Sequence, residues 1–71
     1  MRAPHVDDYV RLTQAVPELN LDPGEVGVVR STWFEPTTAY DVEFGRPGSD
    51  QRTRTLLRPE QVELQNDAAS N

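Results

Sequence analysis

The sequence predicts an all-β fold, a small five-stranded SH3-like barrel with a short helical turn before the last strand. Several short stretches of the 71 residues alternate apolar and polar side chains, as half-buried strands do. Glycine and proline separate these stretches at intervals of about 8–12 residues, which is typical of all-β sandwiches and barrels. No stretch makes a convincing helix. At this length, a barrel of five short strands is the β architecture that fits.

The chain is short enough for one domain at most. We expect a flexible N-terminal segment over residues 1–6, the barrel over residues 7–64 and a disordered, polar tail over residues 65–71. A domain of this size buries only about 60% of the surface of its unfolded chain, so its stability margin is thin.

The first strand is predicted over 9–13, where Val10 and Leu12 alternate with polar or amphipathic neighbours. A long irregular loop follows over 14–22. A helical turn at 17–19 fits there, because proline suits a first helical position. Three apolar residues of this loop are available to pack onto the core: Val16, Leu19 and Leu21.

The stretch DPGEVGVV at 22–29 organises the centre of the chain. Pro23 and Gly24 predict a type II turn, since proline presets φ at the second position and glycine supplies the positive φ at the third. The second strand then runs from about Glu25 to Trp33. We expect Val26 and Val29 to be buried, an arrangement that requires a bulge near the glycine at 27.

The third strand, at 39–44 (AYDVEF), is the clearest in the chain, with three apolar residues on one face and two acidic residues on the other. A connector rich in glycine and proline leads to a fourth strand at about 51–57. If these strands form a hairpin, Arg52 and Arg54 share the outward face with Asp41 and Glu43, where opposite charges can pair. One helical turn at 58–61 precedes a closing strand at 62–64.

Three segments carry a resemblance to a known family: DPGEVG at 22–27, AYDVEF at 39–44 and LRPEQV at 57–62. In this order and spacing they resemble the bacterial domain of unknown function 4926 family, over about residues 7–64. The resemblance implies a small SH3-like barrel and brings no established activity. Val28 and Arg30 depart from the family pattern, where threonine and an apolar residue are usual, and this leaves the register of the second strand open.

The residue types argue against an enzyme, and no catalytic residue, cofactor site or metal site is expected. There is no cysteine, and the one histidine, His5, lies near the N-terminus, so a nucleophile would lack a base. Asp7 and Asp8 are adjacent and lack the spacing of a calcium loop. The sequence at 22–27 lacks the Gly-Lys-Ser/Thr ending of a phosphate-binding loop.

The charge and hydropathy of the chain limit its partners. The net charge is −5, from 12 acidic residues and 7 arginines with no lysine, and this negative field disfavours nucleic-acid binding. No apolar run reaches the length of about 20 residues that a membrane helix needs, and no signal-peptide core is present. We therefore expect a cytoplasmic protein that binds neither nucleic acid nor membrane, and the resemblance to the 4926 family implies a bacterial origin.

The expected function is non-catalytic binding of another protein, as an adaptor or accessory subunit. The predicted surface joins Trp33, Phe34 and Arg30 to the first loop, which contributes Glu18, Asn20 and Asp22. An alternative for Trp33 and Phe34 is that they cover the end of the barrel core. An alternative function is that of an acidic inhibitor or immunity-type protein that neutralises a basic toxin or enzyme. Homodimerisation through an edge strand is a further alternative for so small a core.

Overall fold

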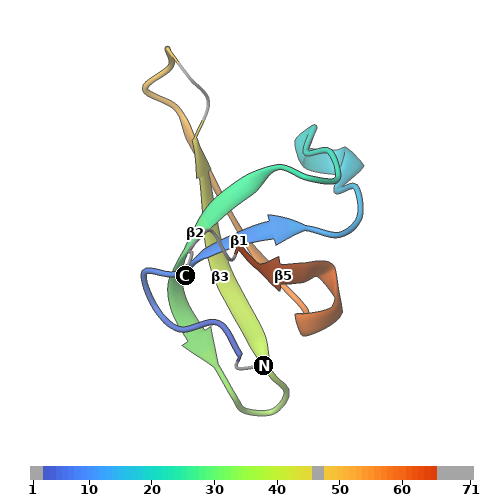
Figure 1. Ribbon diagram of the computed structural model, residues 1–71, viewed down its shortest axis with the longest axis vertical. Helices are drawn as coiled ribbons and strands as arrows, with labels where there is room; N and C mark the ends of the chain where they lie inside the picture. Colours follow the sequence, from blue (N-terminus) through green and yellow to red (C-terminus); the bar gives the residue numbers. More distant parts are fainter. Residues whose placement is uncertain (1–2, 46–47, 66–71) are drawn as a thin grey trace.

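The computed structural model describes residues 3–45 and 48–65, which fold into a single antiparallel β-sheet (Figure 1). The strands follow one another in space in the order β4-β3-β2-β1-β5. Their bounds are β1 Tyr9–Leu12, β2 Val26–Trp33, β3 Ala39–Gly45, β4 Arg52–Leu57 and β5 Val62–Leu64. Two single-turn 3-10 helices complete the fold, η1 at Pro17–Leu19 in the first loop and η2 at Pro59–Gln61 before β5.

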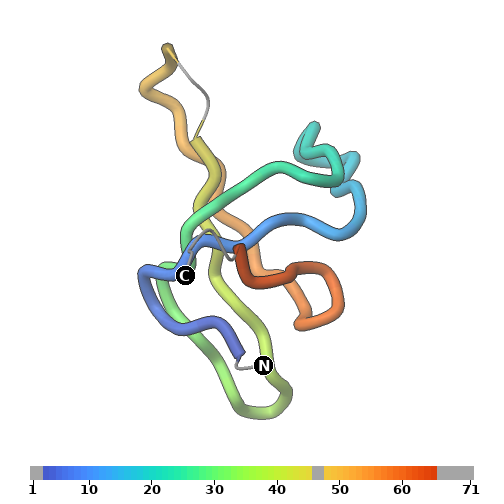
Figure 2. Tube along the Cα trace, viewed as in Figure 1, coloured from blue at the N-terminus to red at the C-terminus, as the bar shows by residue number. Residues whose placement is uncertain are grey.

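The prediction of an all-β, five-stranded fold with a helical turn before the last strand is confirmed. Strands β2, β3 and β4 form a meander, and β1 pairs with both β2 and β5. The sheet curls around its core, as the trace in Figure 2 shows. Among the described residues no ladder joins β4 to β5, so the barrel is open between these two strands.

The long first loop packs as the sequence predicts. Val16 and Leu21 are buried and form an isolated β-bridge to each other, while Leu19 packs against the core from η1. The predicted turn at Pro23 is present: Gly24 has a φ of 92°, and the Glu25 amide donates to the Asp22 carbonyl at 3.2 Å. This turn delivers the chain directly into β2.

The predicted inward face of β2 is wrong at one of its two positions. Val29 is fully buried, but Val26 is 41% exposed and the bulge is not near Gly27. The register shift lies between Val29 and Ser31, where β2 faces β3. Gly27 instead takes the inward position next to Val29, because β3 passes too close for a side chain. A Cβ there would lie 2.7 Å from Cγ1 of Val42.

The hairpin of β3 and β4 is confirmed with the predicted faces. Tyr40, Val42 and Phe44 are buried, and the register pairs Glu43 with Arg54 across the outward side. Leu57 ends β4 in the core. The capping Gln61 side chain of η2 accepts a hydrogen bond from the Arg58 amide at 2.7 Å, and β5 then closes the fold against β1.

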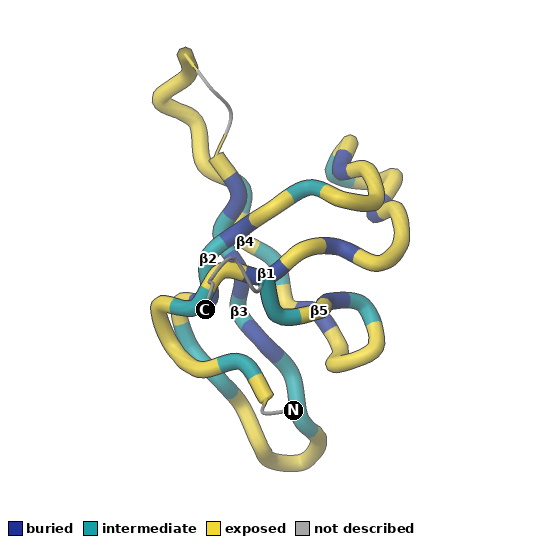
Figure 3. The backbone as a smooth tube through the Cα atoms, viewed as in Figure 1, coloured by how far each residue is buried: buried dark blue, intermediate teal, exposed yellow. Residues whose placement is uncertain are grey.

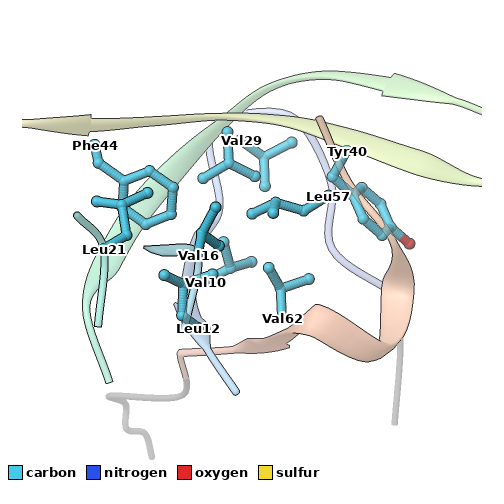
Figure 4. Packing of buried hydrophobic residues seen from close by; sticks show 10 residues of the cluster. Val10, Leu12, Val16, Leu21, Val29, Tyr40, Phe44, Leu57 and Val62 are labelled. Atoms are coloured by element: carbon cyan, nitrogen blue, oxygen red, sulfur yellow. The ribbon is translucent and has the colours of Figure 1, made fainter. Parts of the chain in front are cut away.

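The core is a cluster of ten buried apolar side chains. The buried positions, dark blue in Figure 3, lie mainly where the strands cross. Figure 4 shows Phe44 and Leu21 together at one end of this cluster and Tyr40 and Leu57 at the other. No polar or charged residue is buried among the described residues. The members are Val10, Leu12, Val16, Leu21, Val29, Tyr40, Val42, Phe44, Leu57 and Val62.

The predicted flexible ends fall partly outside the described residues, which omit 1–2 and 66–71. The predicted tail starts at Gln65, but the amide of this residue donates to the Tyr9 carbonyl at 2.9 Å and so extends the pairing of β5 with β1. Before β1, the Asp7 amide donates to the carbonyl of Val29 at 2.8 Å, so the pairing of β1 with β2 also continues towards the N-terminus.

Candidate functional site

The candidate site lies on the side of the sheet that faces away from the core, which we call the outer face. Side chains on a strand alternate between the two faces, and the register of each pair shows which residues share a side. The outer face carries Tyr9, Arg11, Val26, Val28, Arg30, Ser31, Trp33, Asp41, Glu43, Arg52, Arg54, Leu56 and Glu63.

A β-bulge in β2 sets the composition of this face. Val29 pairs with Val42 and Ser31 with Asp41, so Arg30 is the extra residue. Arg30 and Ser31 therefore both point outward, where the Arg30 Nε donates to Glu43 Oε1 at 2.8 Å and the Ser31 hydroxyl lies 3.3 Å from Asp41 Oδ2. Alternation then resumes one position later, and this brings Trp33 to the outer face.

Two acidic side chains of β3 organise the charges of the outer face. Glu43 lies between two guanidinium groups, with its Oε1 2.8 Å from the Nε of Arg30 and its Oε2 3.6 Å from the Nε of Arg52. The Asp41 carboxylate accepts hydrogen bonds from both the Nε and an Nη of Arg54. The hydrogen bond from Arg30 holds the pKa of Glu43 below its ordinary value. The hydrogen bond from Arg54 does the same for the pKa of Asp41. Both groups are thus charged at neutral pH, which suits ion pairing and does not suit proton transfer.

A shallow groove of about 180 Å³ is open on the outer face beside this ion-pair network. Its apolar lining comes from Tyr9 of β1 and from Val26 and Val28 of β2. Its charged lining comes from Arg30 of β2, Glu43 of β3 and Arg52 of β4. Gly45 contributes no side chain next to Arg52, and a Cβ there would lie 3.2 Å from Cδ of that arginine. The groove is lined by Tyr9, Val26, Gly27, Val28, Arg30, Glu43, Gly45 and Arg52.

The aromatic side chains outside the core are strongly exposed. Tyr9 is 58% exposed, Trp33 is 53% exposed and Phe34 is 67% exposed. The alternative in which Trp33 and Phe34 cover the end of the barrel core is therefore wrong. Trp33 ends β2 on the outer face, and Phe34 follows it in the turn to β3.

The structure divides the predicted binding surface into two separate regions. Glu18 is in η1, Asn20 follows it with a φ of 58°, and Asp22 opens the turn before β2. This loop and the turn after Trp33 lie at opposite ends of β2, as Figure 1 shows. Eight extended residues span about 25 Å, so one small contact does not reach both regions. Of the predicted residues, Arg30 and Trp33 share the outer face.

The binding surface predicted from the sequence does not include two residues that line the groove, Tyr9 of β1 and Arg52 of β4. Tyr9 is opposite Val28 in the register, and this pairing joins the aromatic ring to the start of β2. The alternation of β1 already indicates that Tyr9 faces away from Val10 and Leu12. A prediction with the bulge at Arg30, and not near Gly27, would have placed Tyr9, Arg30 and Trp33 on one face of the sheet.

The described residues contain no group of histidine and acidic side chains that could hold a metal ion. The described part of the chain also has no helix that is long and apolar enough to cross a membrane. In comparisons with family models, curated proteins and solved structures, the chain gave no match. The resemblance to the 4926 family therefore stays a prediction.

Proposed function

We propose that the chain is a non-catalytic protein-binding domain, an adaptor or accessory subunit, that uses the outer face of β1 and β2. The observation that carries this proposal is that Arg30 shares the outer face of the sheet with two exposed aromatic residues, Tyr9 of β1 and Trp33 of β2. Tyrosine, tryptophan and arginine are the residue types most enriched at the energetic centres of protein interfaces.

The sheet supports this role because it holds the anchors rigidly. Strand pairing fixes the backbone of Tyr9 against Val28 and that of Trp33 against Ala39, so binding would cost little backbone entropy. Each aromatic side chain can bury on the order of 150–250 Å². The core does not use either ring. Folding therefore does not require these two rings, and both are available to a partner.

Capture of partners from a lysate of the source cells tests the proposal. The tagged chain is compared with a variant that carries Tyr9→Thr and Trp33→Thr, since threonine is β-branched and, like the aromatic residues it replaces, suits a strand. The expected result is a stoichiometric partner that the wild-type chain captures and the double variant does not, with unchanged circular dichroism.

A variant of the first loop is the matched control. Glu18→Gln with Asp22→Asn changes two exposed residues at the other end of β2 and should leave capture unchanged. Retention of the partner by the folded Tyr9 and Trp33 variant would contradict the proposed surface, as would the absence of a partner for the wild-type chain.

One observation favours a second candidate, an inhibitor or immunity-type protein that neutralises a basic toxin or enzyme. The first loop, residues 13–25, holds Glu18, Asp22 and Glu25 and no basic residue. Such a region would attract a cationic partner, with an association rate that falls steeply as salt increases. In the same capture experiment this candidate predicts the opposite pattern, in which the loop variant loses the partner and the outer-face variant keeps it.

A further inference from the structure

We propose that the groove beside Tyr9 accepts one acidic side chain, aspartate or glutamate, flanked by apolar residues of the partner protein. The inference rests on the proposed function of the outer face and gives the chemistry of the partner segment that would bind there.

The size of the groove fits one side chain. Pockets for drug-sized ligands have volumes of about 300–1,000 Å³, whereas this groove measures about 180 Å³. A cofactor would lie largely outside it, while a single side chain presented by a partner would be enclosed on two sides.

The charges of the groove favour a carboxylate. Its lining contains two guanidinium groups, of Arg30 and Arg52, and the single carboxylate of Glu43. The Glu43 side chain is only 16% exposed, while the two arginine side chains keep 45% and 54% of their surface in solvent. Asp7 reaches Arg30 only at 3.8 Å and is itself 78% exposed. The lining is thus locally cationic in a chain of net charge −5.

The arginine side chains also suit this ligand in their geometry. A guanidinium presents several donors in one plane and pairs with a carboxylate in a bidentate manner. Arg52 directs its Nη1 to the carbonyls of Ser49 and Gln51, both at 3.3 Å, so its stem is held at the rim of the groove. The apolar part of the lining, Tyr9, Val26 and Val28, would receive the apolar neighbours of the acidic residue, and Val26 is 41% exposed there.

This arrangement makes Glu43 a competitor of the incoming carboxylate. Glu43→Gln removes the negative charge and keeps the shape, so it should strengthen binding of an acidic peptide. Arg30→Gln and Arg52→Gln should each weaken it. Arg58→Gln is the matched control, because Arg58 is paired with Glu60 at 2.7 Å and does not line the groove.

The test is a selection of short random peptides on the immobilised chain, followed by anisotropy titrations with labelled synthetic copies of the selected sequences. We expect an aspartate or glutamate next to apolar residues in the selected peptides. Replacing that acidic residue by its amide, or Arg30 or Arg52 by glutamine, should raise Kd by about tenfold, the scale of a lost charge-assisted hydrogen bond. Glu43→Gln should lower Kd, Arg58→Gln should leave it unchanged, and added salt should raise it.

Several outcomes would overturn the inference. Peptides that require Tyr9 and Trp33 but show no acidic preference would reject it and leave the proposed function standing. Failure to select any peptide would also reject it, while the capture experiment separately decides the proposed function. Displacement of the peptide by millimolar inorganic phosphate would indicate a general anion site. A dimer in light scattering that Arg30→Gln abolishes would assign the groove to a second copy of the chain.

Circular dichroism checks that each variant folds. If Arg30→Gln fails to fold, Arg52→Gln, near the β3–β4 connector, provides the test of the arginine contribution.

Discussion

The Arg30 Nε donates to Glu43 Oε1 at 2.8 Å across a bulge that adds Arg30 to β2. The bulge changes the faces of every later residue of the strand. Under regular alternation from the buried Val29, Trp33 would point into the core. With Arg30 as the extra residue, Trp33 points outward instead. One inserted residue thus places both the arginine and the tryptophan on the outer face.

The first prediction is that Trp33 contributes to binding and not to stability. Trp33→Thr should change the free energy of unfolding by about 0.5 kcal/mol or less, as is usual for surface positions. Phe44→Ala, in the buried core, should cost about 3–5 kcal/mol. Urea unfolding followed by circular dichroism measures both. A loss above about 2 kcal/mol for Trp33→Thr would mean that the indole packs on the core.

The second prediction concerns the close approach of β2 and β3 at Gly27. A methyl group at this position would meet Cγ1 of Val42 at 2.7 Å, the Glu43 carbonyl oxygen at 2.8 Å and a ring carbon of Phe44 at 2.8 Å. Because one of these contacts is backbone, Gly27→Ala should destabilise the domain by about 1–3 kcal/mol. A decrease in the urea midpoint, with an unchanged m-value, would show this. Equal stability of Gly27→Ala and wild type would contradict the register of β2.

The third prediction concerns the turn that starts β2. Gly24 has a φ of 92°, and a Cβ at this position would have no atom within 4 Å, so the cost of a side chain there is conformational. Gly24→Ala should therefore destabilise by about 1–2 kcal/mol through backbone strain alone. Thr37→Ala, at an exposed position in another turn, is the control. A melting temperature equal to that of the control would argue against the type II turn.

The fourth prediction is acid lability of the ion pairs. Hydrogen bonds from Arg54 and Arg30 lower the pKa of Asp41 and Glu43 below the ordinary values of 3.8 and 4.5. Their contribution to stability is fully present above these values and is lost as the pH falls through them towards the lower native pKa values. The melting temperature should thus decrease below about pH 4.5.

The double variant Asp41→Asn with Glu43→Gln isolates this contribution. It should begin from a lower melting temperature at neutral pH and lose less of it on acidification than the wild-type chain. Parallel curves for the two proteins between pH 7 and pH 3 would show that these pairs do not supply the pH dependence.

Much of the fold follows from local patterns. The alternation at 39–44 is strict, and it correctly predicted the buried faces of β3 and the pairing of its acids with Arg52 and Arg54. Proline and glycine correctly marked η1, η2 and the turn at Gly24. These features depend on conformational preferences of individual residues, so one sequence is sufficient to recognise them.

The register of β2 could not be predicted in this way. Its valine and glycine residues suit either face, and nothing local distinguishes a bulge at Gly27 from one at Arg30. The choice depends on β3, which leaves no space for a side chain at Gly27 and offers Glu43 to Arg30. The composition of the candidate site could not be predicted for the same reason, because the face of Trp33 depends on that register.

The most direct test of the central claim uses the single tryptophan as a reporter. In the free chain Trp33 should be quenched readily by acrylamide, and addition of the captured partner should shift its emission to shorter wavelength and protect it from the quencher. That result is predicted by an outer face that binds protein through Tyr9, Arg30 and Trp33. An emission and a quenching constant that stay the same on saturation with the partner would contradict it.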